Sequence, residues 1–516
     1  MLLSKILPDI ARMYPTNNAM KYKNEILTYD QLLHRVSCVA RGFHDLCIKP
    51  GERIALVGYP SPYLAIAEYA AVAIGAIPVT IFPGLASIEI KQILQDASPV
   101  AVVYDLDQLY LSEIFSSINI EYLISCKSDR NLPHSIEDFI TNYPALTEWY
   151  EADPNDIALL IYTGGTTGRA KGVMHSHRSI RNWAFMNPQK GVGHNPNKKT
   201  LVFNQAHLTG QYILWASIYE GGCLIYPDSY PLQAYEVVDI IEREQIKYLG
   251  TVGLLLRDIV SMDNIKSRDL QSIEGISCGG APISENILHK ARDLFPKAQI
   301  TEVYSQTESG QFISLVSINQ CINEGTLHRL TSVGNQDNLA LWGQQPFLVR
   351  IVDDTGTDVE VGEIGEVICQ GDQMMLGYWN NVEETNKALR NGWLHTGDLG
   401  RFDQDGYLYL IDRKKDMIIV DGSNVYCTEI EEVLSKHPAI LEIAVIGTRL
   451  SNDGEEVTAV VTLQPDTDLT LEELKQFCLN QIASFKIPTR MEVVNALPRT
   501  SVGKVNKAVI RKKYNS

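Results

Sequence analysis

The feature that most constrains the fold is a regular alternation of apolar segments that begins near residue 53. Short apolar runs at 53–59, 76–82 and 100–105 are typical of buried strands, and residues 63–75 and 89–97 between them have helical patterns. Strands that alternate with helices of about ten residues or more form parallel-rich sheets with helices on both faces. We therefore expect an α/β fold.

A second alternating run follows from residue 200. Its expected elements are strands at 200–205, 223–227 and 247–252 and helices at 208–221 and 234–245. Two later strands run directly into polar loops rich in Gly, Ser or Thr, at 277–284 and 302–309. Ligands of open parallel sheets bind at the carboxyl ends of strands, so these loops are candidates for a binding site.

The pattern changes after about residue 339 to short strands separated by DDTG and DQDG turns, and then to an α+β pattern. Helices are expected at 429–438 and 471–482. The interpretation is a large N-terminal domain over 1–411, a hinge over 412–416 and a small mobile C-terminal domain over 417–516.

Bulk composition excludes several classes of protein. The formal net charge of the 516-residue chain is −17, which disfavours a broad surface for nucleic acid or anionic membrane. The nine cysteines form no CxxC pair, which argues against a zinc ribbon or a disulfide framework. The N-terminus does not resemble a secretory signal, and the most apolar stretch, Tyr69–Phe82, is too short to span a bilayer. We expect a cytoplasmic enzyme without a membrane span.

The strongest local motif is DIALLIYTGGTTGRAKG at 156–172, where an apolar strand runs into a loop of glycines and threonines that ends near Lys171. Glycines let backbone N–H groups approach a polyanion, hydroxyls add donors, and a lysine neutralises charge. Gly172 follows the lysine, so this is not a Walker A loop. The motif predicts a phosphate-binding loop, and the alternative is a flexible surface turn.

Other motifs follow in a fixed order along the chain. They are SCGGAPIS (277–284), EVYSQTES (302–309), GEIGEVICQG (362–371), GYWNN (377–381), GWLHTGDLG (392–400), DRKKDMIIVDG (412–422) and PRTSVGKVNK (498–507). Together with the glycine-rich loop, this set resembles the acyl-adenylate-forming superfamily of acyl- and aryl-CoA ligases, amino-acid adenylation domains and luciferases. The resemblance spans nearly the whole chain. The sequence departs from the usual pattern at Gly164, Ala170 and Cys427, where many relatives have Ser, Pro and Pro.

The resemblance implies binding sites for ATP and Mg²⁺. The implied cofactor-binding residues are Thr163, Gly164, Gly165, Thr167, Gly168, Lys171, Gly280, Ala281, Pro282, Tyr304, Ser305, Thr307, Asp398, Arg413 and Gly422. Glu308 offers the hard carboxylate that Mg²⁺ prefers beside phosphates, although a lone Glu is more often a solvated loop acid. Asp398 would accept two ribose hydroxyls, with Arg413 adding a donor, although an Asp after Gly is otherwise most often a turn residue.

The implied reaction has two steps. A carboxylate attacks the α-phosphate of MgATP to give an acyl-adenylate and pyrophosphate, and a thiol then displaces AMP. The implied catalytic residues are Lys504, Thr166, Glu308 and His207; by itself Lys504 is a solvated lysine of a basic tail. Between the steps the small domain of relatives rotates, and alignment with DRKKD makes Lys415 the pivot, after which the Gly422 loop lines the thiol channel.

The segment NQAHLTG (204–210) bears on the acid. Amino-acid-activating relatives usually place an Asp after the Phe of this motif, whereas Asn204 follows Phe203 here, so a fatty or aryl acid is favoured. His207 fits the acyl- and aryl-ligase pattern, or is a loop residue. CoA is the favoured thiol, because no carrier-protein segment follows the last motif. The alternatives are a ligase that loads a separate acyl carrier protein and a non-catalytic pseudoenzyme that binds nucleotide or acyl-CoA.

Overall fold

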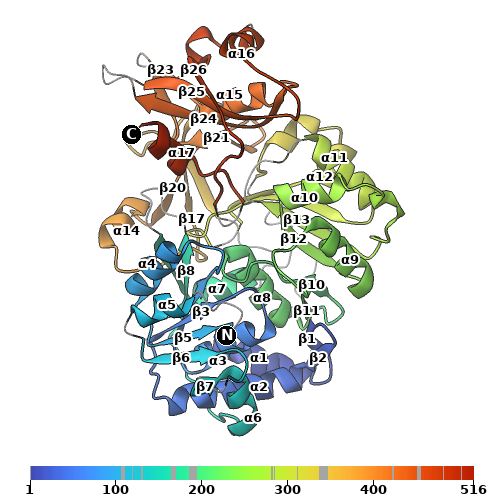
Figure 1. The fold of residues 1–516 in the computed structure, drawn as a ribbon, viewed down its shortest axis with the longest axis vertical. Coiled ribbons are helices and arrows are strands. Elements are labelled where there is room, and N and C mark those ends of the chain that lie inside the picture. The colour runs from blue at the N-terminus through green and yellow to red at the C-terminus, as the bar shows by residue number, and fades with distance from the viewer. Residues whose placement is uncertain are drawn as a thin grey trace. The chain divides into compact units, whose positions relative to one another are not determined.

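The computed structural model describes residues 2–105, 111–118, 120–129, 132–163, 170–184, 194–279, 283, 285–310, 312–335, 347–420, 423–449, 455–479, 481–500 and 503–515. The chain divides into two compact units (Figure 1). Unit 1 comprises Met1–Gly165, Arg169–Leu348 and Cys369–Leu394, and unit 2 comprises Thr166–Gly168, Val349–Ile368 and His395–Ser516. The predicted hinge at 412–416 therefore lies inside unit 2, and the predicted domain boundaries stay a prediction.

The first sheet of unit 1 has the order β15-β14-β13-β12-β10-β11-β1-β2 among the described residues. Its strands are β1 (Asn18–Tyr22), β2 (Glu25–Thr28), β10 (Lys199–Leu201), β11 (Cys223–Tyr226), β12 (Tyr248–Val252), β13 (Gly275–Gly279), β14 (Gln299–Tyr304) and β15 (Ser314–Ser317). Neighbouring strands run parallel from β1 to β14, and the edge strands β2 and β15 are antiparallel.

The second sheet of unit 1 has the order β18-β9-β8-β4-β3-β5-β6-β7. Its strands are β3 (Arg53–Val57), β4 (Ile77–Ile81), β5 (Ala101–Tyr104), β6 (Tyr122–Ser125), β7 (His134–Ser135), β8 (Ile157–Thr163), β9 (Lys171–Ser176) and β18 (Gly377–Tyr378). The strands from β8 to β7 in this order run parallel. Strand β9 pairs antiparallel with β8, and β18 pairs antiparallel with β9. The predicted parallel-rich α/β fold is confirmed.

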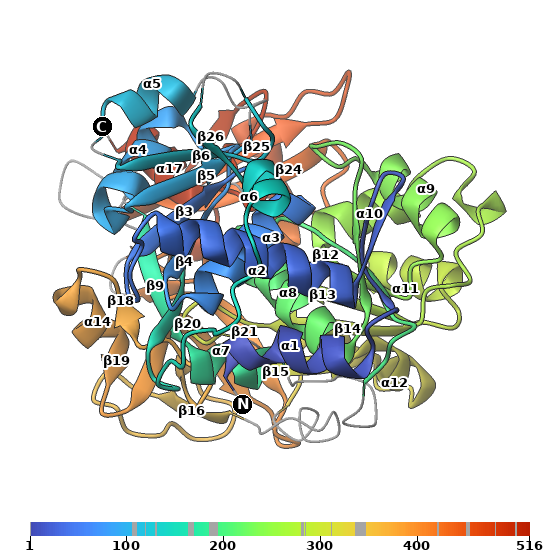
Figure 2. The ribbon, with the colours of Figure 1, turned by 90° about the horizontal axis from the view of Figure 1, so that it is seen from below.

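Helices cover both sheets of unit 1 (Figure 2). They are α1 (Leu3–Met13), α2 (Tyr29–Asp45), α3 (Pro62–Ala73), α4 (Ser87–Ala97), α5 (Leu111–Ser116), α6 (Ile136–Asn142), α7 (His177–Ala184), α8 (Leu208–Glu220), α9 (Ala234–Glu244), α10 (Gly253–Val260), α11 (Glu285–Leu294), α12 (Ile318–Asn323) and α14 (Val382–Ala388).

The two sheets of unit 1 share a helical layer. Side chains of β3 alternate between two cores, with Ile54 and Leu56 in one and Ala55 and Val57 in the other. The shared core also holds side chains of α1, α2, α3, α8, β11 and β5, while α4 packs on one outer face and α9 to α11 on the other. Helices α3 and α8 are apolar on nearly all sides because they are buried in this central layer.

Unit 2 continues through shorter strands into an α+β unit, as the sequence predicts. Its elements are β16 (Leu348–Val352), β17 (Gly365–Gln370), β20 (Trp393–Phe402), β21 (Leu408–Arg413), β22 (Ile418–Val420), β23 (Ser423–Val425), α15 (Cys427–Leu434), β24 (Ile440–Arg449), β25 (Glu455–Leu463), α16 (Leu471–Cys478), β26 (Arg490–Val493) and α17 (Lys507–Tyr514); β16, β17 and β20 extend across the division, and β19 (Leu389–Arg390) belongs to unit 1. Strand β21 pairs antiparallel with β20, and this ladder ties the chain before residue 412 to unit 2.

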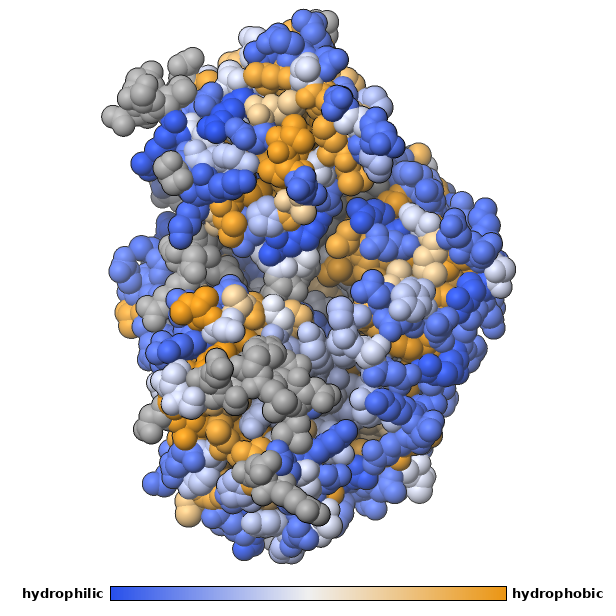
Figure 3. All heavy atoms as spheres, in the orientation of Figure 1, coloured by the Kyte–Doolittle hydropathy of each residue, from blue (hydrophilic) through white to orange (hydrophobic). Residues whose placement is uncertain are grey.

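The predicted apolar helices and strands appear close to their expected bounds, whereas the alternation predicted nothing before residue 53, where α1, β1, β2 and α2 lie. On the face drawn in Figure 3, apolar side chains interrupt a surface that is mostly hydrophilic. Among the described residues, no helix is both long enough and apolar enough to cross a membrane.

Candidate active site

The glycine-rich loop connects β8 to β9. Strand β8 is buried along most of its length, and its last residue, Thr163, pairs in register with Lys171, the first residue of β9. The loop residues Gly164, Gly165, Thr166, Thr167 and Gly168 lie outside the described residues. The structure thus describes the two ends of the predicted phosphate loop, and the roles of its residues stay a prediction.

Lys171 makes two contacts inside unit 1. Its ammonium forms an ion pair with Glu384 of α14 and lies 4.9 Å from the centroid of the Tyr378 ring. The hydrogen bond from Lys171 is the main reason that the pKa of Glu384 is lowered. In this structure the carboxylate of Glu384 therefore balances the positive charge of Lys171.

Glu308 lies just beyond the end of β14 and is half-buried. The hydroxyl of Tyr378 donates to Glu308 Oε1 at 2.8 Å, and the backbone N–H of Met375 donates to the Glu308 carbonyl at 2.9 Å. Both donors belong to one segment of unit 1. The carboxylate is thus oriented by a hydroxyl donor, and its role as a metal ligand stays a prediction.

A buried histidine supports the loop that carries Glu308. His175 Nε2 lies 2.9 Å from the carbonyl oxygen of Thr307, and burial lowers the pKa of His175 to about 3. The neutral imidazole is therefore the donor. Its ring packs edge-on to Trp183 with centroids 4.5 Å apart. At Gly310, where φ is +84°, an added Cβ would lie 2.5 Å from the Trp183 Nε1 atom, so the loop requires glycine here.

Tyr304 and Ser305 lie at the carboxyl end of β14, with Tyr304 largely buried. Beside them, β13 ends at Gly279, and Gly280, Ala281 and Pro282 lie outside the described residues. Burial raises the pKa of Glu302 to about 8, an effect that the backbone N–H of Ile283 opposes by hydrogen bonding. This bond holds the chain at Ile283, directly after the implied binding residues Gly280, Ala281 and Pro282.

The segment Phe203–His207 leads from β10 into α8. His207 is the N-cap residue of α8, its N–H donates to the Asn204 carbonyl at 3.0 Å, and its carbonyl accepts from the Gln211 N–H at 2.9 Å. An added Cβ at Gly210 would lie 2.2 Å from the Asn204 carbonyl oxygen, so the segment folds closely against the first turn of the helix.

Unit 2 carries the predicted ribose-binding pair. Asp398 is 5% exposed, and its Oδ1 lies 2.6 Å from Nε of Arg413. The two residues are register partners on β20 and β21. The Asp398 N–H donates to Oγ1 of Thr396 at 3.1 Å, which fixes the turn of the motif. A buried acid and a partly exposed guanidinium side by side suit two adjacent sugar hydroxyls.

Four charged residues of the segment 412–416 form ion pairs or hydrogen bonds within unit 2, among them Arg413 with Asp398. Lys414 pairs with Asp354 at 2.8 Å and with Glu366 at 3.2 Å, while Asp416 pairs with Arg511 at 2.5 Å. Asp412 Oδ2 accepts from the Thr428 N–H at 3.4 Å.

Burial lowers the pKa of Lys415. The Asp416 carbonyl accepts from Cys427 Sγ at 3.0 Å, so the residue that replaces the family's usual proline is a buried contact of this segment. The Cys427 side chain thus has a structural part at the predicted hinge.

Lys504 is exposed and lies in a tight loop before α17. Its carbonyl accepts from the Thr500 N–H at 2.7 Å, and the carbonyl of Gly503, where φ is +80°, accepts from Arg499 Nη1 at 2.6 Å. Arg499 also pairs with Glu442 of β24. These contacts hold the backbone of the loop that carries Lys504. Gly422 lies outside the described residues.

The sequence interpretation missed four side chains that shape these regions: Glu68, His175, Glu302 and Tyr378. Tyr378 stands in the motif GYWNN, and Glu302 begins the motif EVYSQTES, so both were within recognised segments. Their partners are distant in sequence, and spacing therefore gave no sign of them.

The described residues hold no group of three or more His, Cys, Asp or Glu side chains arranged to bind a metal ion. A single oriented carboxylate such as Glu308 fits Mg²⁺ that is bound mainly through substrate phosphates.

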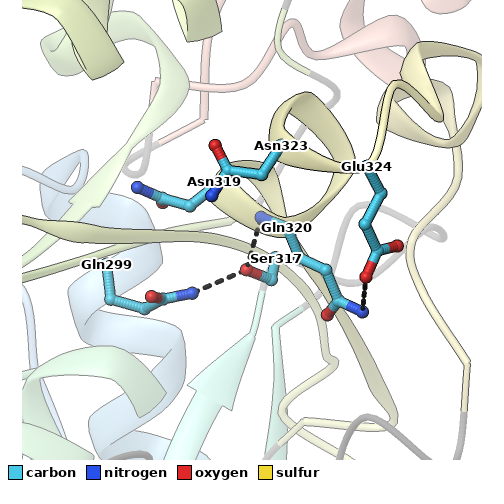
Figure 4. A pocket seen from close by; sticks show the side chains of 6 residues that line it. All are labelled: Gln299, Ser317, Asn319, Gln320, Asn323 and Glu324. Carbon is cyan, nitrogen blue, oxygen red and sulfur yellow. Dashed lines mark hydrogen bonds between the residues drawn. The ribbon is translucent and has the colours of Figure 1, made fainter.

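A polar hollow in unit 1 lies at the opposite end of β14 from Tyr304 (Figure 4). Its lining side chains bond to one another: Gln299 Nε2 donates to Ser317 Oγ at 2.6 Å, and Gln320 Nε2 donates to Glu324 Oε1 at 3.0 Å. It contains none of the predicted site residues.

Comparison with known proteins defines the family. Residues 7–379 match the AMP-binding enzyme family, and residues 429–504 match the C-terminal domain of AMP-binding enzymes. The chain therefore belongs to the AMP-binding enzyme family, within the acyl-adenylate-forming superfamily of ligases.

Similar proteins cover the chain almost completely. A feruloyl-CoA synthase of Amycolatopsis sp is 28% identical over 98% of this chain and 97% of its own length. A long-chain-fatty-acid–CoA ligase of Escherichia coli O157:H7 is 27% identical over 98% of this chain and 92% of its own length. The amide bond synthetase McbA of Marinactinospora thermotolerans has the same fold, with a TM-score of 0.86, 24% identity and full coverage of both chains.

Proposed function

We propose that the protein activates a carboxylic acid with MgATP to an acyl-adenylate and transfers the acyl group to CoA. The observation that carries the proposal is the oriented carboxylate of Glu308 at the end of β14, in a chain that belongs to this family.

The residues that would bind the phosphates and the acid belong mainly to unit 1, together with the glycine-rich loop. Glu308 would hold Mg²⁺ together with the phosphates of ATP, and the metal supplies neutralisation of their charge. The glycine-rich loop, including Thr166, would donate N–H and hydroxyl groups to the phosphates. Tyr304 would stack on adenine.

The residues of unit 2 would bind the ribose and promote adenylation. Asp398 and Arg413 would contact the sugar hydroxyls. Lys504 would place its ammonium where the attacking carboxylate meets the α-phosphate, and thereby stabilise charge that develops in the transition state. The segment 412–416 would be the hinge, pivoting at Lys415, that moves Lys504 away and brings Gly422 to the thiol.

The acid would be a fatty or aryl acid without an α-ammonium group. Asn204 has no charge to pair with an ammonium, and leaving a charge unpaired on burial costs several kcal/mol. The relatives named as fatty-acid and feruloyl ligases agree with this class.

The test is pyrophosphate release from ATP and Mg²⁺ with a panel of decanoic, benzoic and cinnamic acids and standard α-amino acids. We expect pyrophosphate release with at least one of the three acids. No α-amino acid should give a faster release than that acid. Folded protein that releases pyrophosphate with no member of the panel would contradict adenylation. Adding CoA, holo acyl carrier protein or an amine to the active pair then identifies the acceptor: formation of acyl-CoA supports the proposal, and a product with only another acceptor contradicts CoA.

A further inference from the structure

A fully buried carboxylate in unit 1 has no part in the proposed chemistry. Glu68 of α3 is 0% exposed, and its recorded partners are all uncharged N–H donors. Nε2 of Gln205 and Nε2 of Gln211 each lie 3.1 Å from Glu68 Oε2, and Nε1 of Trp215 lies 3.2 Å from Oε1. Burying a carboxylate without a cation is costly, and an apolar side chain of similar size often gives a more stable core.

The three donors come from one stretch of chain, the segment Phe203–His207 and the first two turns of α8. Gln211 Nε2 also donates to the backbone carbonyl of Gln205 at 2.7 Å, which ties the segment to the helix. From the other side, Thr80 Oγ1 of β4 donates to the Ala206 carbonyl at 3.4 Å. The position of His207 at the start of α8 therefore depends on contacts that converge on Glu68.

For accepting these three hydrogen bonds, an ionised carboxylate suits this position better than an amide does. Its two oxygens offer about four acceptor sites and no donor, so they accept all three N–H groups, whereas the single amide oxygen of a glutamine offers about two. Because both glutamine amides direct an N–H at Glu68, their Oε1 atoms face elsewhere. These two oxygens and Oδ1 of Asn204 are buried and accept no hydrogen bond from the part of the chain that the structure describes. Glu68 thus sets which side of each amide the segment presents.

We propose that Glu68 is a positioning residue for the acid substrate: it fixes the segment Phe203–His207 against α8 and thereby sets where the acid lies. This inference rests on the proposed function, in which the segment borders the acid. ATP would be held by other elements, so the effect of Glu68 is confined to the acid.

The test compares Glu68→Gln with a matched control, Glu220→Gln, by steady-state pyrophosphate release. Glu220 is a buried acid at the far end of the same helix, where it pairs with Lys198 at 2.7 Å. With the acid of the panel that the wild type uses fastest, we expect Glu68→Gln to raise the KM for the acid at least tenfold and to leave the KM for ATP within twofold. Glu220→Gln should leave both KM values within twofold, whatever it does to the melting temperature.

A second variant approaches the network from the helix. Gln211→Met removes one donor and should raise the KM for the acid in the same way. If Glu68 acts through Gln211, the double variant should be no worse than the more impaired single variant. This arm keeps the inference testable if Glu68→Gln does not fold.

The outcomes separate the inference from the function on which it rests. An active wild type with unchanged acid KM in Glu68→Gln or Gln211→Met overturns the inference alone, and so does an equal rise in the KM values for acid and ATP. A wild type that is inactive with the whole panel overturns the proposed function and the inference together.

Discussion

Two charged regions of this chain are held in opposite ways. Glu68 is buried in the central layer of unit 1 and bonds only to uncharged donors, whereas the segment 412–416 of unit 2 interacts mainly through ion pairs that are partly exposed. A buried carboxylate with three neutral donors has one satisfied arrangement. Partly exposed ion pairs cost little to exchange, because water and salt replace either partner. The first arrangement suits a fixed binding segment, and the second suits a segment that changes conformation.

The second region has partners both before and after it in the sequence. Arg413 and Lys414 pair with acids that precede the segment in sequence, while Asp412 and Asp416 interact with α15 and α17, which follow it. The segment is thus attached to both sides through charges of opposite sign. A rotation about Lys415 would leave the ion pairs of Arg413 and Lys414 on one side and that of Asp416 on the other, and it would break the contact between Asp412 and α15.

The largest expected effect concerns the fixed carboxylate Glu308. Glu308→Ala should slow pyrophosphate release by about 10³-fold, because it removes preorganised stabilisation of charge on the phosphates. The measurement is the initial rate at limiting Mg²⁺. Glu324→Ala, an exposed acid after α12, serves as the control and should keep the wild-type rate. A normal rate for Glu308→Ala would make Glu308 a simple loop acid.

The second prediction concerns how much the burial of Glu68 lowers the free energy of unfolding. Burial raises the pKa of Glu68 to about 7 from an ordinary 4.5, although hydrogen bonds from Gln211, Gln205 and Trp215 lower it. The folded state therefore binds the proton more tightly than the unfolded state, so Glu68 lowers stability as pH rises from about 4.5 to 7.

This pKa difference corresponds to about 3 kcal/mol. Glu68→Gln, which does not ionise, should gain about that much in free energy of unfolding relative to the wild type between pH 4.5 and pH 8. Urea unfolding at the two pH values measures the gain. An equal difference between the two proteins at both pH values would show that the pKa of Glu68 is the same in the folded and unfolded states, which would contradict this prediction.

The third prediction concerns the segment 412–416, which is proposed to change conformation. Lys415→Pro restricts φ at the proposed pivot, so it should trap one conformation and separate the two half-reactions by about tenfold or more. We expect adenylation to survive and thioester formation from supplied acyl-AMP to fall. Rapid-quench measurement of each step checks this, with the melting temperature as a control for folding. Equal slowing of both steps, or of neither, would remove Lys415 from the role of pivot.

The smallest expected effect concerns an ion pair beside the hinge. Arg511→Gln breaks the pair with Asp416 and should lower the free energy of unfolding of the small unit by about 1 kcal/mol, less at high salt because ions screen the pair. Denaturation of both proteins at about 0.05 M and about 1 M NaCl, below and above physiological ionic strength, would measure this loss of free energy. A salt-independent loss would mean that the pair acts as a fixed contact, like those of Glu68.

The sequence predicted the parts of the fold and site that depend on neighbours in the chain. The alternation from residue 53 predicted the parallel sheets because strand and helix periods are local properties. Motif order pointed to Glu308 and Asp398, of which Glu308 lies just beyond the end of β14 and Asp398 lies within β20. Glu68 was hidden because its donors lie 137 to 147 residues away, where no spacing rule reaches. The pairing of Lys171 with Glu384 was hidden for the same reason, since 213 residues separate them.

The most direct test of the account is the effect of Lys504→Ala on the two half-reactions. The loop of Lys504 is held by Arg499 and Thr500, and its exposed ammonium is proposed to act only where the acid meets the α-phosphate. The account predicts that formation of acyl-adenylate falls by about 10²-fold or more, by analogy with the loss of one preorganised donor. Transfer from supplied acyl-adenylate to CoA should stay within a few-fold of the wild type. Equal loss of both steps, or unimpaired adenylation, would contradict it.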